Sequence, residues 1–131
     1  MRKPYIPKSV LEETFASLLD SKGIIYHRQY KFCDGRNWKS DFFIPEMLLI
    51  VEIEGATFTK GGHTSIYGMV GNIEKYNLIS LLGFRLVRLA TIHFEKRGKA
   101  YLDAILSFIT GEISFDKLKN IKADIKPKRK G

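Results

Sequence analysis

A run of five apolar residues followed at once by two acids constrains this chain more than any other feature. Residues 47–51 read Met-Leu-Leu-Ile-Val, which is typical of a strand buried on both faces. Glu52 and Glu54 follow at positions i and i+2, so both side chains leave the strand on the same side. Ionised carboxylates at the end of a buried strand are costly unless something positive neutralises them. The pattern therefore predicts a cation site at this end of the strand.

A third acid, Asp41, stands eleven positions before Glu52. We expect strands over 38–44 and 47–54, and a tight hairpin between them would bring Asp41 beside the acid pair. Three converging carboxylates suit Mg²⁺ or Mn²⁺, hard ions that keep several waters and bind substrate phosphate. Such an ion polarises a phosphoryl oxygen and activates a water. The sequence thus indicates metal-assisted chemistry on a phosphate ester.

The alternative interpretation of these acids is structural. Asp41 and Glu54 would then be solvated residues at strand ends, and Glu52 alone would pair with Arg85 or Arg88. Zinc chemistry is disfavoured, because the three histidines show no ligand spacing.

Periodicity and turn chemistry predict the remaining elements. In chain order these are a helix from Ser9 closed by Gly23, strands over 24–32, 38–44 and 47–54, a helix from Met69 closed by Gly83, a strand over 84–89, and a helix from Tyr101 closed by Gly111. The second of these helices is predicted from the spacing of its apolar residues Met69, Val70, Ile73, Tyr76 and Ile79. This α-β-β-β-α-β-α order predicts an α/β fold whose mixed four-stranded sheet is flanked by helices.

Composition and charge indicate one folded domain over residues 1–116 and a basic tail over 117–131. The 131 residues are 44% hydrophobic, and Cys33 is the only cysteine, so no intrachain disulfide is possible. No apolar run approaches the roughly 20 residues of a membrane span, and the first residues do not resemble a signal peptide. We therefore expect an intracellular protein with no membrane partner.

The net charge of +8 is concentrated at the C-terminus. Residues 117–131 hold seven lysines and arginines against one aspartate, among them Lys126, Lys128, Arg129 and Lys130, which leaves only +2 for the rest of the chain. A basic arm on a nearly neutral body is typical of attachment to a phosphate backbone without reading its sequence. The alternative is a solubilising tail.

Six short motifs, in this order, resemble one known family. They are Ser9-x-x-Glu12-x-x-Phe15, Arg36-x-Trp38-x-x-Asp41-Phe42, Val51-Glu52-Ile53-Glu54-Gly55, Gly62-His63-Thr64, Glu74-Lys75-Tyr76-Asn77 and Leu82-Gly83-Phe84-Arg85. Together they are similar to the PD-(D/E)xK nuclease superfamily, in the small branch related to very-short-patch-repair endonucleases of bacteria and their phages. The resemblance covers about residues 9–90. It implies a restriction-endonuclease-like αβββαβ core, followed here by a C-terminal helix and the basic tail.

The resemblance also implies a set of metal ligands. Asp41 and Glu52 would hold Mg²⁺ or Mn²⁺, with the carbonyl of Ile53 as a third ligand. Glu12 matches an acid of the first helix that approaches the metal through water, although it is equally placed to close a capping box with Ser9.

The chain departs from the family pattern at Glu54, where many members carry a lysine that orients or deprotonates water. Some relatives do carry Glu-x-Glu. The lysine's role would then be vacant, or filled by Lys75 from the following helix; the alternative for Lys75 is an ordinary surface lysine.

The remaining site predictions are His63, Lys60, Trp38 and Arg36. His63 would protonate a leaving oxygen or bind phosphate, and Lys60 would attract phosphate. Trp38 would stack on a nucleotide and Arg36 would bind phosphate, or Trp38 would pack in the core and Arg36 would be a hydrated turn residue.

These features predict a Mg²⁺-dependent DNA endonuclease, encoded by a bacterium or its phage and acting on structured, branched or mismatched DNA. A homodimer would allow it to cut both strands. The alternative is a catalytically degenerate protein of the same fold that binds DNA or RNA without cleaving it, which the absent motif lysine favours.

Overall fold

The computed structural model describes residues 6–55 and 66–125 of the chain. Up to residue 90 the chain contains α1 (Lys8–Ser21), β1 (His27–Tyr30), β2 (Ser40–Ile44), a 3₁₀ turn η1 (Pro45–Met47), β3 (Leu49–Glu54), α2 (Ile66–Leu81) and β4 (Arg85–Ala90). From residue 91 onward it contains the 3₁₀ turn η2 (Thr91–Phe94), α3 (Lys99–Ile109) and the short α4 (Phe115–Leu118). These two groups of elements belong to two compact units, residues 1–90 and 91–131.

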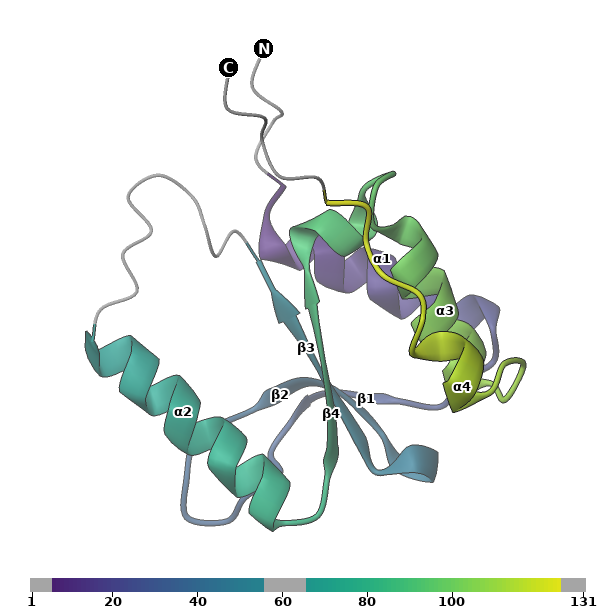
Figure 1. Ribbon diagram of the computed structural model, residues 1–131. Helices are drawn as coiled ribbons and strands as arrows, with labels where there is room; N and C mark the ends of the chain where they lie inside the picture. Colours follow the sequence, from purple (N-terminus) through teal and green to yellow (C-terminus); the bar gives the residue numbers. More distant parts are fainter. Residues whose placement is uncertain (1–5, 56–65, 126–131) are drawn as a thin grey trace, which may run out of the picture. The chain divides into compact units, whose positions relative to one another are not determined.

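The four strands of the first unit form one sheet in the order β1-β2-β3-β4 (Figure 1). The first two pairings are antiparallel, as a meander requires, and β4 is parallel to β3 because α2 carries the chain back across the sheet. This confirms the predicted α/β class and the mixed four-stranded sheet flanked by helices.

The register places the acids of interest opposite one another. Phe42 pairs with Val51, so one step further along the two strands Asp41 faces Glu52. On β1, Arg28 pairs with Phe42, so Gln29 stands opposite Asp41. On the other side, Glu52 pairs with Arg88 of β4. A row of polar residues therefore crosses all four strands at one level of the sheet.

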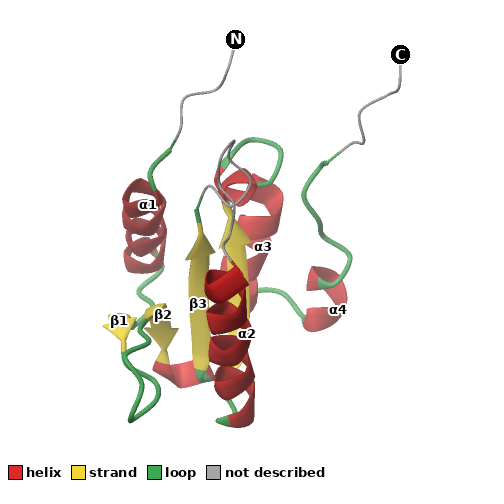
Figure 2. Cartoon of the chain, turned by 90° about the vertical axis from the view of Figure 1, so that its left-hand side faces the viewer, coloured by secondary structure: helices red, strands yellow, loops and turns green. Residues whose placement is uncertain are grey.

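The two helices of this unit cover opposite faces of the sheet (Figure 2). Phe15 of α1 packs edge-on against Phe42, with ring centroids 5.0 Å apart. The neighbouring residue, Phe43, instead packs with Ile50 and with Ile79 of α2. Because successive side chains of a strand point to opposite faces, α1 and α2 lie on different sides.

The apolar run that precedes the acid pair is buried within β3, as its composition predicts. Leu49, Ile50, Val51 and Ile53 are each at most 4% exposed. Leu48, which comes just before the strand, is 54% exposed and adopts φ 50° at the end of η1. The buried part of the run therefore begins at Leu49, two residues later than the predicted start of the strand.

The second unit is held together by local contacts. The ring of Phe108 on α3 lies 6.5 Å from that of Phe115 on α4, and the N–H of Asp124 donates to the carbonyl of Arg97 at 2.8 Å. Lys117, where the basic tail is predicted to begin, lies within α4. No helix in the described part of the chain is both long and apolar enough to cross a membrane.

One local prediction is wrong, and one helix is less covered than its apolar spacing suggests. The capping box of Ser9 and Glu12 does not form, because α1 begins one residue earlier, at Lys8, with Pro7 as its N-cap and no side-chain cap. The apolar stripe of α2 is buried only in part: Ile79 is 1% exposed, whereas Met69, Val70 and Ile73 are 44–52% exposed. Only the C-terminal half of α2 reaches the core cluster on the sheet, so periodicity identified the helix but not how much of it is covered.

Candidate functional site

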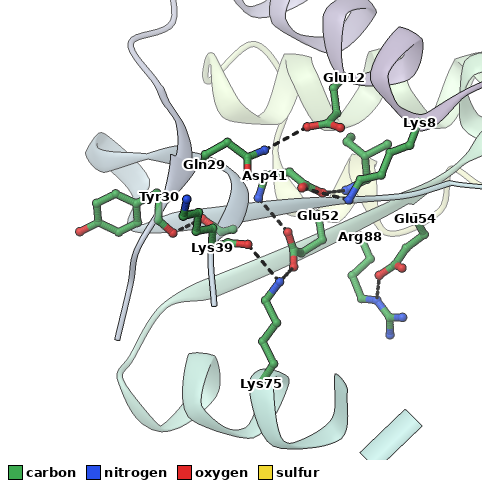
Figure 3. A network of polar contacts seen from close by, with 12 residues as sticks. Lys8, Glu12, Gln29, Tyr30, Lys39, Asp41, Glu52, Glu54, Lys75 and Arg88 are labelled. Carbon is green, nitrogen blue, oxygen red and sulfur yellow. Dashed lines mark hydrogen bonds and ion pairs between the residues drawn. The ribbon is translucent and has the colours of Figure 1, made fainter. Parts of the chain in front are cut away.

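Asp41 and Glu52 bind each other's strands through their carboxylates. The N–H of Asp41 donates to Oε2 of Glu52 at 2.9 Å, and the N–H of Ile53 donates to Oδ2 of Asp41 at 2.7 Å. Both acids are 5% exposed. Each carboxylate therefore has one oxygen fixed by a main-chain donor, and its orientation is set by the sheet itself (Figure 3).

The other oxygen of each carboxylate faces a lysine. The ammonium of Lys8, from α1, lies 3.1 Å from Oδ1 of Asp41. The ammonium of Lys75, from α2, forms an ion pair with Oε1 of Glu52 and also donates to the carbonyl of Lys39 at 3.2 Å. Figure 3 shows these two lysines approaching the acid pair from different helices. Lys75 therefore lies beside the acid pair and has a partner in Glu52, so it is not an unpaired surface lysine.

Nearby charges and burial shift the pKa values of Glu52 and Lys8. Burial raises the pKa of Glu52, and the hydrogen bond from Lys75 only partly offsets it. Burial would lower the pKa of Lys8, but the carboxylates of Asp41, Glu12 and Glu52 outweigh it and raise that pKa above 10.5. Lys8 is thus held in its charged form by three acids.

Glu12 lies at the edge of the same network. Its Oε1 accepts a hydrogen bond of 3.3 Å from Nε2 of Gln29, and burial together with the negative charge of Asp41 raises its pKa. Gln29 itself adopts φ 51°, a left-handed conformation that is uncommon for a residue with a side chain. Residues with strained backbone conformations are found most often at functional sites, and Gln29 lies opposite Asp41 in the sheet.

Glu54 does not join the other two acids, which corrects the prediction that three carboxylates meet. Its Oε1 accepts from the hydroxyl of Tyr76 and from Nε of Arg88, each at 2.7 Å. Burial alone would raise the pKa of Glu54, but these two hydrogen bonds and the charge of Arg88 lower it. Within residues 6–55 and 66–125, no group of three histidine, cysteine or acidic side chains is arranged to hold a metal ion.

Arg36 and Trp38 form a separate surface pair. The guanidinium of Arg36 lies 3.6 Å from the centroid of the Trp38 ring and 3.8 Å from Glu74. The other contacts of Trp38 are with the core cluster, where it stacks nearly parallel to Phe32. Trp38 is thus partly buried against the core cluster, and Arg36 covers a face of its ring.

Several predicted site residues lie outside the described residues. They are His63, Lys60, Lys126, Lys128, Arg129 and Lys130. For Ile53, the hydrogen bond to Asp41 uses its N–H, not the carbonyl predicted as a metal ligand.

Two residues of the network were missed by sequence reasoning. Lys8 is one of many lysines in a basic chain, and no local pattern distinguishes it from the others. Gln29 is an exposed glutamine of β1, and glutamine is not a residue type whose presence predicts a positive φ. Neither role carries a sequence signal, because the contact of Lys8 depends on where α1 packs on the sheet and that of Gln29 on the backbone conformation of β1.

The carboxylate oxygens of the acid pair fit a hard divalent ion that keeps several of its waters. Asp41 and Glu52 together offer two buried carboxylates, each with one oxygen already oriented toward positive charge. A dedicated protein cage of six or more oxygens would require additional ligands, whereas Mg²⁺ is commonly bound by one or two carboxylates, several waters and a substrate phosphate. The pair therefore fits a hydrated Mg²⁺ or Mn²⁺ ion.

Comparison with models of known protein families, and with curated proteins, finds no match for this chain. Its function is therefore inferred from the geometry of the acid pair and the two lysines beside it.

Proposed function

We propose that the chain is a Mg²⁺-dependent endodeoxyribonuclease with a restriction-endonuclease-like fold. The observation that carries the proposal is the mutual orientation of Asp41 and Glu52: two buried acids on adjacent strands, fixed by main-chain donors, each with its second oxygen turned toward a cation. Burying two neighbouring carboxylates is costly, and a site that binds a dication for catalysis is a reason for a fold to retain them.

Asp41 and Glu52 would hold the ion. When bound, it would supply polarisation of a phosphoryl oxygen and a more acidic water. The main-chain N–H groups of Asp41 and Ile53 keep the two carboxylates in place without side-chain rearrangement, which is the preorganisation that such chemistry needs.

Lys75 would take the part of the motif lysine that Glu54 leaves vacant. Its ammonium is anchored by Glu52 and by the carbonyl of Lys39, so it presents a positive charge beside the acid pair. There it would attract the scissile phosphate and orient the attacking water. Glu54, which is bound by Tyr76 and Arg88, would brace β3 against α2 and β4 instead of binding the ion.

One observation favours a second candidate, a degenerate nuclease fold that binds nucleic acid without cutting it. The two acids are matched by two lysines, so the acid pair itself is electrically balanced without a metal. A protein that had lost catalysis could keep this arrangement for stability alone.

Cleavage assays separate the two candidates. The purified protein is incubated with supercoiled plasmid, branched DNA and single strands, in Mg²⁺ or in Mn²⁺. We expect nicking that is lost in Asp41→Asn and in Glu52→Gln and kept in Glu46→Gln, a control that removes an acid of η1. Full cleavage by either site variant would refute the assignment, and binding without a nick in both metals would favour the degenerate fold.

A further inference from the structure

Lys8 stands where a helix does not favour a positive charge. It is the first residue of α1, and the first turn of that helix contains no acidic side chain. The N-terminus of a helix carries a partial positive charge, so a lysine there is unfavourable unless a nearby anion offsets it. The anion is Asp41, at 3.1 Å, so the position of the Lys8 ammonium is explained by the acid pair and not by the helix.

Gly55 makes the approach of Lys8 possible. A Cβ atom at Gly55 would lie 3.2 Å from Cβ of Lys8 and 3.7 Å from its Cγ, and the first of these distances is closer than side chains normally pack. The stem of Lys8 thus passes directly over the residue that follows β3. A glycine immediately after the second acid of the Glu-x-Glu pattern is an independent sign that the fold makes room for this lysine.

The two lysines at the site are held differently. Lys75 contacts two acceptors and has a side chain that is 15% exposed, whereas the side chain of Lys8 is 47% exposed. Withdrawing Lys75 would remove the lysine from Oε1 of Glu52 and from the carbonyl of Lys39. The ammonium of Lys8 is solvated more readily when it leaves, because its side chain is half exposed, and an incoming cation would take its place at the carboxylate of Asp41.

We propose that Lys8 is a built-in counter-ion that competes with the divalent metal for Asp41, so that metal binding requires its displacement. This inference rests on the proposed function, since it concerns the same site. Two cations cannot share Oδ1 of Asp41 without strong mutual repulsion in a partly buried setting. The acid pair is therefore neutralised in metal-free protein, and the metal is bound more weakly than two bare carboxylates would bind it.

The test is a titration with Mn²⁺ followed by electron paramagnetic resonance of the free ion, which requires no DNA and no cleavage. The variants are Lys8→Met, which removes the charge but keeps the stem, and Lys8→Arg, which keeps a cation. Lys31→Met is the matched control, because it removes one exposed lysine that follows β1. Circular dichroism of each variant establishes that it is folded.

We expect Lys8→Met to bind Mn²⁺ roughly tenfold more tightly than the wild type, a factor equivalent to about 1.4 kcal/mol. Lys8→Arg and Lys31→Met should stay within about twofold of the wild type. The proposal is also supported if Lys8→Met binds Mn²⁺ and the wild type shows no binding.

Two other results would overturn it, and they are distinguishable. If the wild type binds Mn²⁺ and Lys8→Met binds it equally or more weakly, the role of Lys8 is wrong while the metal site stands. If neither protein binds the ion, the metal site itself is wrong, and the competition falls with it.

Discussion

Asp41 and Glu52 are joined through the main chain of β2, because the N–H of Asp41 donates to Oε2 of Glu52 at 2.9 Å. The carboxylate of Asp41 in turn accepts from the N–H of Ile53. The acids thus serve the sheet as hydrogen-bond acceptors at the level where the pairing of β2 with β3 ends, next to Phe42 and Val51. Their loss should therefore affect stability as well as any activity.

Replacing Asp41 tests this structural role. Asp41→Ala removes the acceptor of the Ile53 N–H and the partner of Lys8, so we expect the free energy of unfolding to fall by about 1–3 kcal/mol. Asp41→Asn keeps an oxygen acceptor of the same size and should lose less. Urea denaturation in the presence of EDTA measures both. An alanine variant as stable as the wild type would show that the carboxylate is not needed by the sheet.

Glu54 should make stability depend on pH in the acidic range. Its pKa is lowered in the folded protein by Tyr76 and Arg88 against the opposing effect of burial, so it binds protons less readily there than in the unfolded chain. Its contribution is fully present above the ordinary value of 4.5 and is lost as the pH falls through the lower, folded-state pKa.

The comparison is between the wild type and Glu54→Gln, which cannot titrate. Thermal denaturation is followed in EDTA from about pH 7 to about pH 3. We expect the difference in melting temperature between the two proteins to shrink as the pH decreases below 4.5. A constant difference over the whole range would contradict the ion pair with Arg88.

The sole tryptophan provides a direct test of the Arg36 stack. Because Arg36 lies over the ring of Trp38, Arg36→Ala should expose that ring and shift its fluorescence emission to longer wavelength. The loss of stability should be small, about 0.5–1 kcal/mol, as for exposed cation–π pairs. Glu74→Ala is the control, since it removes the weaker contact of Arg36 without uncovering the ring. An unchanged emission spectrum in Arg36→Ala would show that the stack does not persist in solution.

The order of the helices and strands could be predicted from the sequence because each element has a strong local signal. The apolar run before Glu52 predicted β3, and glycines predicted the ends of the helices, where Gly23, Gly83 and Gly111 all adopt positive φ. The proximity of Asp41 to Glu52 could also be predicted, since a hairpin brings its own two strands together.

The charge partners could not be predicted in the same way. Glu54 lies on the same strand as Glu52 but is bound by Arg88, and Lys8 reaches Asp41 from the start of the chain. These pairings depend on how α1, α2 and β4 are placed on the sheet, and many lysines and arginines were equally available. A two-residue spacing predicts that two acids point to the same face of a strand. Which lysine or arginine pairs with each acid depends on the tertiary structure.

The basic tail should control how binding to DNA depends on salt. Deleting residues 126–131 removes Lys126, Lys128, Arg129 and Lys130 and leaves α4 intact. If all four contact phosphates, the slope of log K against log salt should become shallower by about 3–4, at roughly 0.9 for each contact. Fluorescence anisotropy with a labelled duplex at several salt concentrations gives the slope. An unchanged slope would show that these residues do not contact DNA.

Two isoleucines of α2, Ile73 and Ile79, should differ sharply in their contribution to stability. Ile79 is 1% exposed and packs on Phe43 and Ile50, so Ile79→Ala should cost about 2–5 kcal/mol through lost burial and a cavity. Ile73, nearer the start of the helix, is 52% exposed, so Ile73→Ala should cost less than about 1 kcal/mol. Both substitutions remove the same atoms from the same helix, so the difference isolates burial from helix propensity. Equal losses in chemical denaturation would mean that α2 is covered along its whole apolar stripe, as its periodicity alone predicts.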